Sequence, residues 1–119
     1  MAERRRPSSR YLSIDEVWME FYAERASSGH YYLSREWLRS RNRLLLHYAP
    51  YVKAIVGRFL GQEPRNADLR LMARGMLALS RAIDVREAGN LEDFVPEVVS
   101  VVAAECRRAI REHEEAGEA

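Results

Sequence analysis

The sequence predicts an all-α protein, a compact bundle of four to five helices. Apolar residues recur at the alternating three- and four-residue spacing of amphipathic helices over several long segments. No segment alternates with a period of two for long enough to predict a strand. The 119 residues, 47% of them hydrophobic and 31% charged, are sufficient for one buried core. We therefore expect a single helical domain over residues 13–115.

The chain begins with the basic segment MAERRRPSSR, and we expect residues 1–12 to form a disordered arm. Arg4, Arg5 and Arg6 can bind nucleic-acid phosphates weakly, although a solvated tail is the simpler interpretation. The net charge of the whole chain is only +1, so its overall charge predicts no attraction to nucleic acid or to a membrane.

The first helix is predicted to run from Ser13 to about Ala26. Ser13 and Glu16 have the spacing of a capping box, in which each side chain accepts a hydrogen bond from the backbone N–H of the other residue. The helix should end at the segment Ser27-Ser28-Gly29. Its buried face is expected to carry Ile14, Val17, Trp18, Phe21 and Tyr22.

A second helix is predicted to begin at Ser34 and to continue through LLLHYAPYVKAIVGRFLG, residues 44–61, where Gly61 should end it. Pro50 lies inside this pattern, although a proline removes one backbone donor and crowds the carbonyl of Leu46. The expected apolar stripe consists of Trp37, Leu38, Leu45, Tyr48, Val52, Ile55 and Phe59.

A third helix is predicted to begin near Asn66, which can cap it, with Asp68 in its first turn. Gly75 in the middle of this helix costs about 1 kcal/mol relative to alanine. We therefore expect Gly75 to admit the close approach of another backbone. The stripe of this helix is expected to be Leu69, Met72, Met76, Leu79 and Ile83.

The last helix is predicted to follow a turn over residues 84–90, and Asn90 can cap it. Its apolar stripe fades into a charged end. The stripe consists of Val98, Val99, Val102, Cys106 and Ile110. In the chain as a whole, the residues expected to be largely buried are Trp18, Leu45, Val52, Ile55, Leu79 and Val102.

The sequence has no pattern typical of an enzyme or a metal site. The three histidines, His30, His47 and His113, have no metal-ligand spacing with one another or with Cys106. A lone cysteine is more often a core residue than a nucleophile. We expect no catalytic residues, no metal and no cofactor. No apolar segment approaches the ~20 residues of a membrane helix and no signal peptide is apparent, so a cytoplasmic protein is predicted.

The segment RLLLHYAPYVKAIVGRFL, residues 43–60, resembles the second conserved region of bacterial sigma factors, most closely the flagellar and sporulation type. That type shows a leucine-rich approach, then H-Y-x-P-L-V-K, apolar residues and G-R. Residues 14–22 similarly resemble the short helix that opens these proteins. The resemblance implies that the proline is tolerated within a long helix of the domain. The matching residues are His47, Tyr48, Pro50, Val52, Lys53, Gly57 and Arg58.

The next family segment, usually D-L-x-x-x-G-x-x-G-L-x-x-A-I, is matched in part by RLMARGMLALSRAI, residues 70–83. In the family this helix docks on the clamp helices of RNA polymerase, with acidic residues contributing. Here Arg70 replaces the aspartate, Arg74 an often acidic or polar residue, and Ala78 the second glycine. Asp68, two residues before the usual acid, can restore one acidic contact through a shifted pairing. The family residues that are kept are Leu71, Gly75, Leu79, Ala82 and Ile83.

A further family segment, F-x-T-Y-A-x-x-x-I-R, supplies the aromatic and basic groups that capture and melt promoter DNA. In FVPEVVSVVAAE, residues 94–105, only Phe94 is kept, and apolar or acidic residues stand at the other positions. Flipped bases need stacking surfaces and cationic grooves. The resemblance therefore implies that promoter melting is lost.

The sequence predicts a stand-alone, degenerate sigma-region-2 domain that regulates transcription through protein–protein contacts. Its partner would be an anti-sigma protein, for which it acts as a decoy, or the RNA polymerase core. Two alternatives stay open: a minimal functional sigma factor that binds core polymerase and promoter DNA, and a helical dimerisation module unrelated to polymerase. Arg70, Arg74 and Arg81 are expected to form one exposed strip that binds an acidic partner, with Asp68 nearby.

Overall fold

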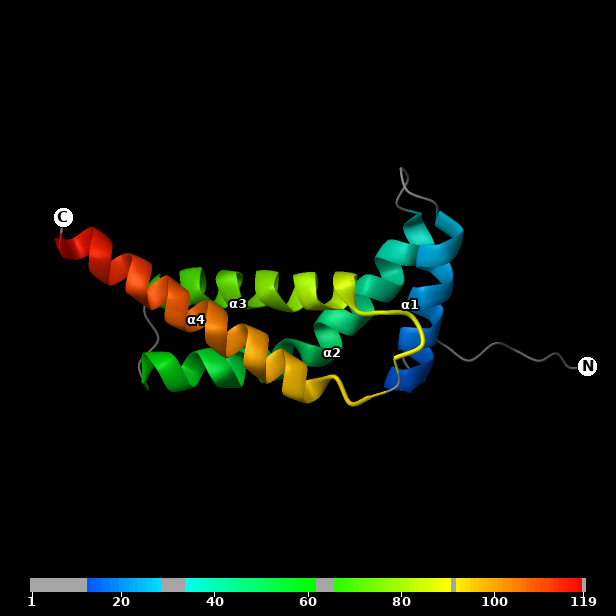
Figure 1. Ribbon diagram of the computed structural model, residues 1–119, viewed down its shortest axis with the longest axis horizontal. Coiled ribbons are helices and arrows are strands. Elements are labelled where there is room, and N and C mark those ends of the chain that lie inside the picture. The colour runs from blue at the N-terminus through cyan, green and yellow to red at the C-terminus, as the bar shows by residue number, and fades with distance from the viewer. Residues whose placement is uncertain (1–12, 29–33, 62–65, 91, 119) are drawn as a thin grey trace, which may run out of the picture. The chain divides into compact units, whose positions relative to one another are not determined.

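The computed structural model describes residues 13–28, 34–61, 66–90 and 92–118, and within these ranges every regular element is a helix (Figure 1). The helices are α1 (Ile14–Ser28), α2 (Arg35–Leu60), α3 (Asn66–Val85) and α4 (Val95–Glu118). The all-α prediction is confirmed. None of these four helices is both long enough and apolar enough to cross a membrane.

The chain divides into two compact units, and the boundary between them falls inside α2, between Leu44 and Leu45. The first unit contains α1 and the start of α2, and the second contains the rest of α2 with α3 and α4. The single domain expected over residues 13–115 stays a prediction. The basic arm expected over residues 1–12 lies outside the described residues.

The first unit contains two capped helix N-termini, of which the cap at Ser13 was predicted and the cap at Ser34 was not. Ser13 N donates to Glu16 Oε1 at 2.8 Å and Glu16 N donates to Ser13 Oγ at 3.2 Å, so the capping box is confirmed. At the start of α2, Trp37 N donates to Ser34 Oγ at 3.0 Å. α1 ends at Ser28, slightly beyond the expected end. Local hydrogen bonding thus sets where both helices begin.

Aromatic side chains form the core of the first unit. Trp18 and Phe21 meet edge-to-face with ring centroids 5.8 Å apart, and Phe21 lies 5.8 Å from Trp37 of α2. All three rings are buried, which confirms the prediction for Trp18. Beside them, Arg43 Nη1 of α2 donates to Glu20 Oε1 of α1 at 2.7 Å. Aromatic contacts and the Arg43–Glu20 ion pair therefore join the two helices.

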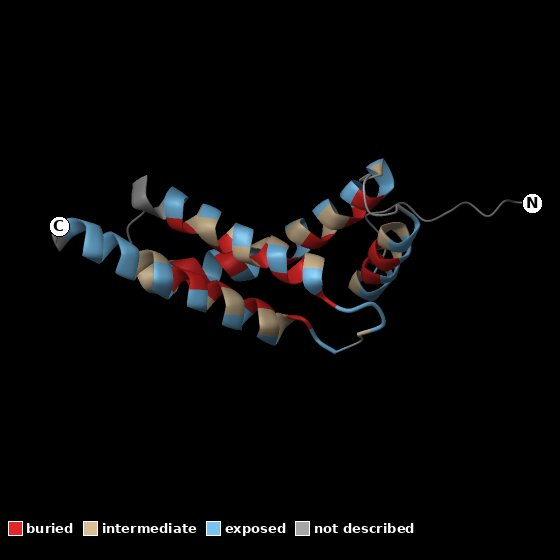
Figure 2. Cartoon of the chain, turned by 45° about the horizontal axis from the view of Figure 1, so that its top comes forward, coloured by how far each residue is buried: buried red, intermediate tan, exposed pale blue. Residues whose placement is uncertain are grey.

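Aliphatic side chains of α2, α3 and α4 dominate the core of the second unit. In Figure 2 the buried residues of α3 and α4 follow one side of each helix. A Cβ atom built on Gly75 would lie 2.9 Å from Val52 Cγ1. It would also lie 3.4 Å from Val56 Cγ2 and from Val102 Cγ1. The atoms nearest to Gly75 therefore belong to valine side chains of α2 and α4, where a close approach of another backbone was expected. The buried hydrophobic residues are Tyr48, Val52, Ile55, Val56, Leu71, Leu79, Ala82, Ile83, Phe94, Val98, Val102 and Cys106.

The structure differs from the predicted apolar stripes at several positions. Leu69 is 75% exposed while Leu71 is buried, because the core side of α3 is the side that carries Gly75. Residues two positions apart are separated by about 200° around the helix axis, so only one of these leucines can face the core. In α2, Leu44 is fully buried and Leu45 is only half-buried. Two further residues of the predicted stripes are exposed, namely Leu38 and Val99.

Pro50 lies on the exposed side of α2, and the helix continues through it. Leu46, whose carbonyl loses its helical donor to the proline, is exposed as well. Water can therefore satisfy that carbonyl, and the proline costs less than it would inside the core. Gly61 ends the helix with a φ of 79°, as predicted, in the left-handed conformation that favours glycine.

Arg86 organises the connection between α3 and α4, although sequence reasoning did not single it out. Its guanidinium lies 4.9 Å from the centroid of the Phe94 ring, and the residue is buried. Nη2 donates to the backbone carbonyl of Glu92 and, at 3.3 Å, to Asn90 Oδ1. Nη1 lies 3.6 Å from Glu97 Oε1. A buried cation thus ties the connecting segment to the start of α4.

The cap of α4 differs from the prediction. Asn90 Oδ1 accepts a hydrogen bond from Glu92 N at 2.9 Å, which is a turn within the connecting segment rather than a helix cap. Asp93 takes the capping role, since its Oδ1 accepts a hydrogen bond from Val95 N at 3.1 Å. The side chains of residues 66–68 are not among those described, so the cap predicted at Asn66 stays a prediction.

Candidate functional site

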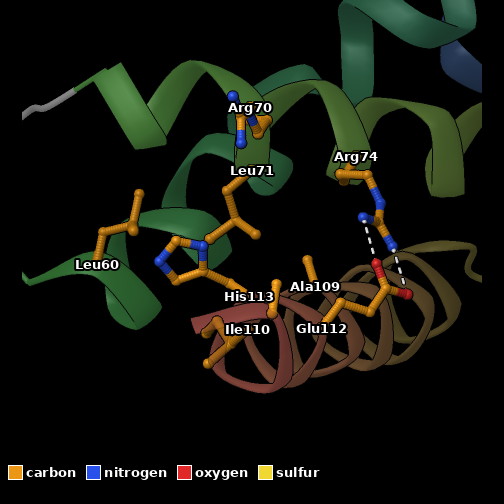
Figure 3. Close-up of a pocket in the computed structure, with 9 residues that line it drawn as sticks. Leu60, Arg70, Leu71, Arg74, Ala109, Ile110, Glu112 and His113 are labelled. Atoms are coloured by element: carbon orange, nitrogen blue, oxygen red, sulfur yellow. Dashed lines mark hydrogen bonds and ion pairs between the residues drawn. The ribbon is translucent and has the colours of Figure 1, made fainter. Parts of the chain in front are cut away.

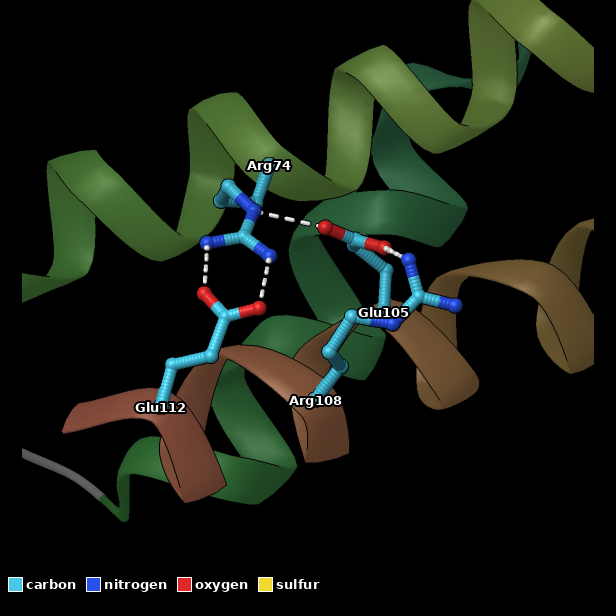
Figure 4. A network of polar contacts seen from close by, with 4 residues as sticks. All are labelled: Arg74, Glu105, Arg108 and Glu112. Carbon is cyan, nitrogen blue, oxygen red and sulfur yellow. Dashed lines mark hydrogen bonds and ion pairs between the residues drawn. The ribbon is translucent and has the colours of Figure 1, made fainter. Parts of the chain in front are cut away.

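The three arginines of the predicted partner-binding strip lie on α3 in different environments. Arg70 and Arg81 are exposed. The side chain of Arg74 is only 31% exposed, and it points toward α4 (Figure 4). The expectation of one uniformly exposed strip is therefore wrong for Arg74. Binding of a partner by the three residues stays a prediction.

Two glutamates of α4 hold the guanidinium of Arg74 (Figure 4). Arg74 Nε donates to Glu105 Oε2 at 2.6 Å. The two Nη atoms donate to the two carboxylate oxygens of Glu112, at 3.0 and 3.4 Å. Arg108 Nη1 donates to the other oxygen of Glu105 at 3.2 Å. Two arginines face two glutamates, so this network is electrically balanced.

The hydrogen bonds of the network stabilise its charged forms. The bonds to Glu112 and then to Glu105 raise the pKa of Arg74, and the bond from Arg74 lowers the pKa of Glu112. For Arg74, the acidic helix that the sequence predicts as a partner is thus supplied by α4 of the same chain. Glu105 and Glu112 are seven residues apart and lie on one face of the last helix, a spacing that could have indicated this pairing.

A groove of about 390 Å³ lies beside the network, between the start of α3 and the end of α4 (Figure 3). Leu60, at the end of α2, closes it on one side. The side chains of Arg70 and His113 and the Arg74–Glu112 pair supply its polar atoms. Such a volume is in the range of binding sites for small ligands or for a few side chains of another protein. The apolar lining consists of Leu60, Leu71, Ala109, Ile110 and Ala116.

A second hollow, of about 360 Å³, lies between the C-terminal half of α3 and the N-terminal half of α4. Arg81 lines it together with Arg108, and Glu97 and Glu105 line it as well. The cations of this hollow are therefore accompanied by an equal number of acids. Its apolar lining consists of Ala78, Ala82, Val85, Val101 and Ala104.

Phe94, the one aromatic residue kept from the promoter-binding segment, lies inside the second unit. It is 2% exposed, and its ring meets that of Tyr48 edge-to-face with centroids 5.0 Å apart. The sequence of α4 that follows contains six glutamates and three arginines, and no Phe, Tyr or Trp. Stacking of an unpaired base requires an accessible ring beside cations. Phe94 is not accessible for that purpose.

Reactive and metal-binding groups do not converge in the described part of the chain. Cys106 is fully buried, and desolvation raises the pKa of its thiol, which disfavours the reactive thiolate. Among the described residues there is no group of three or more His, Cys, Asp or Glu that could hold a metal ion. The side chains of Arg4, Arg5, Arg6 and Asp68 lie outside the described structure, so their predicted roles stay predictions.

Comparisons with protein-family models, with curated proteins and with solved structures give no match for this chain. The fold and the site define an all-α protein with a balanced polar network between α3 and α4 and a groove beside it. The resemblance to sigma region 2 rests on the residues quoted above, and the function that it implies is a proposal.

Proposed function

We propose that this chain is a stand-alone domain of the sigma-region-2 type that regulates transcription through protein–protein contacts and has lost promoter melting. One observation carries the proposal. The family residues that α3 keeps face the core of the second unit, whereas Arg70 and Arg74, which replace family residues, lie outside it. The kept residues that are buried are Leu71, Gly75, Leu79, Ala82 and Ile83.

This division favours a retained fold with an altered binding surface. Interior residues determine how α3 packs against α2 and α4, and exposed residues determine what the helix can bind. A clamp surface suited to acidic side chains would be repelled by Arg70, and an acidic surface would be attracted. The substitutions therefore support a change of partner, such as an anti-sigma protein or another part of the polymerase.

The matching residues of α2 also support the sigma resemblance over an unrelated dimerisation module. His47, Lys53 and Arg58 match the family pattern, and all three are exposed. Core packing therefore does not account for their presence. Exposed polar residues that match the family pattern therefore support a binding surface on α2.

The proposed loss of promoter melting is supported by Phe94 and α4. The Phe94 ring is covered by the core, and α4 carries more acids than bases. A negatively charged helix repels the DNA backbone, so this surface disfavours the alternative of a minimal initiation factor.

The proposal is tested by affinity capture. The tagged chain is incubated with an extract of the cells that produce it, and the captured proteins are identified by mass spectrometry. We expect RNA polymerase subunits or an anti-sigma protein. The Leu79→Asp chain, whose second unit should not fold, is the control and should capture neither. Capture of proteins unrelated to transcription would contradict the proposal.

Two further measurements separate the alternatives. We expect no sequence-selective binding of single-stranded promoter DNA at physiological salt, and only weak, salt-sensitive binding through Arg4, Arg5 and Arg6. Tight, sequence-selective binding would favour the minimal sigma factor. A stable homodimer that captures no transcription protein would favour the dimerisation module.

A further inference from the structure

The groove between α3 and α4 contains a cation that no described carboxylate neutralises. Arg70 is exposed, lines the groove, and makes no ion pair with a described residue. The neighbouring network is balanced, since two arginines there face two glutamates. Both oxygens of Glu112 are bonded to Arg74, so this carboxylate, although it lines the groove, does not neutralise Arg70.

The remainder of the groove is apolar, with one further polar ring. Leu60, Leu71 and Ile110 come from three different helices, so the apolar lining depends on the folded second unit. The ring of His113 lies among these side chains (Figure 3). A group that fills this groove well must bring an apolar portion for the leucines and an anionic oxygen for the guanidinium.

We propose that the groove binds an acidic segment of a partner protein. An apolar side chain of the segment packs on Leu60, Leu71 and Ile110, and an adjacent carboxylate accepts hydrogen bonds from Arg70 and His113. This inference rests on the proposed function and names the chemistry of the partner.

Charge complementarity favours an acidic protein segment in the groove over a basic segment or nucleic acid. A basic segment is repelled by Arg70. α4, which forms one wall, has six glutamates and three arginines, so it repels a long polyanion such as nucleic acid more than a segment that brings a single carboxylate to Arg70. A carboxylate matches the planar fork of Arg70 through two parallel hydrogen bonds. An apolar residue flanked by Asp or Glu satisfies both parts of the groove.

Two synthetic peptides serve as probes in the experiment. Both are helical and about 16 residues long, because shorter helices are marginal in water. One carries leucine and glutamate on the same face, and the other carries leucine and lysine at the same positions. Each is titrated into the full-length, isotope-labelled chain and followed by NMR. We expect the glutamate peptide alone to shift the amide signals of Leu60, Arg70, Leu71, Ile110 and His113.

A matched pair of variants locates the binding. Arg70→Glu and Arg81→Glu make the same charge change on exposed residues of α3, but only Arg70 lines this groove. We expect Arg70→Glu to weaken binding of the glutamate peptide at least about tenfold, and Arg81→Glu less than about twofold. Ala116→Trp places a large ring at an exposed position of the lining and should abolish binding. Far-UV circular dichroism verifies that all three variants are folded.

Three outcomes would overturn the inference: equal affinity for the two peptides, an equal loss in both arginine variants, or signals that shift elsewhere on the chain or not at all. The proposed function fails separately. If a captured transcription protein binds the Arg70→Glu chain as well as the unaltered one, the function stands and the groove inference fails. If the glutamate peptide binds as expected but no transcription protein is captured, the groove stands and the function fails.

Discussion

The two units of this chain have cores of different kinds. In the first unit a few large rings, Trp18, Phe21 and Trp37 among them, supply the packing. In the second, many smaller aliphatic side chains meet around Gly75. Few large side chains concentrate the buried area, whereas many small ones depend on close fit throughout. The first core should therefore be most sensitive to loss of one ring, and the second to any added charge or volume.

The largest expected effect is that of Leu79→Asp in the second unit. Leu79 is fully buried, so the aspartate would be an unpaired buried charge that costs several kcal/mol against a total stability of about 5–15 kcal/mol. We expect the second unit to unfold, measured as a loss of helical signal in circular dichroism. Leu77→Asp, on the 45% exposed neighbour two residues earlier, is the control and should stay folded. Unchanged helicity and melting temperature in Leu79→Asp would refute the assignment of this core.

Phe21→Ala should have the next largest effect, in the first unit. The ring is fully buried among other aromatics, and its removal should cost about 3–5 kcal/mol. Both tryptophans of the chain, Trp18 and Trp37, lie in this unit, so tryptophan fluorescence reports on it. The exposed Met19 provides the control, because Met19→Ala should change stability by less than about 0.5 kcal/mol. Similar losses in the two variants would mean that the rings do not dominate this core.

Gly75→Val tests close fit in the second unit. The new Cβ alone would lie 2.9 Å from Val52 Cγ1, and the short valine has little freedom to move away. We expect a loss of about 1–3 kcal/mol in chemical denaturation. At Gly57 a Cβ meets nothing within 4 Å, so Gly57→Val should be neutral or slightly stabilising. If both variants were equally stable, the packing around Gly75 would be looser than the structure indicates.

The smallest expected effect is a loss of stability in acid that both units share. Hydrogen bonds from the backbone and side chain of Ser13 lower the pKa of Glu16, and the hydrogen bond from Arg74 lowers that of Glu112. A lowered pKa in the folded state contributes stability that is present above the ordinary value of 4.5 and is lost as the pH falls through the folded value. The melting temperature should therefore decrease as the pH is lowered below about 4.5. Ser13→Ala and Arg74→Leu should each reduce this dependence, and an unchanged pH profile in both would contradict the assignment.

The features that sequence reasoning predicted correctly depend on residues close together in the chain. The cap at Ser13 needs only Glu16, and Gly61 ends α2 through its own backbone conformation. The six-residue core prediction was right for every member except Leu45. Adjacent residues such as Leu44 and Leu45 differ by about 100° around the helix, and only the neighbouring helices determine which one is covered.

The features that sequence reasoning missed depend on which helices become neighbours in the folded chain. Leu69 fits the apolar period of α3 as well as Leu71 does, but the position of Gly75 against α2 and α4 selects Leu71. Arg74 looked like a surface residue because Glu105 and Glu112 lie more than thirty residues further along the chain. The groove beside Arg70 is likewise invisible in the sequence, since three separate helices line it.

The hydrogen bonds from Arg74 to Glu105 and Glu112 fix the position of α4 along the axis of α3. Val98 and Val102 repeat at one-turn intervals, so sliding α4 by one turn along α3 would exchange one apolar contact for a similar one. The two glutamates that bind Arg74 do not repeat at one-turn intervals. A one-turn shift would carry both carboxylates away from the Arg74 guanidinium, and Glu105, which is nearly covered, would keep only Arg108 of its own helix. The hydrogen bonds of Arg74 therefore select one axial register of α4. With the valine contacts alone, several registers would be almost equal in energy.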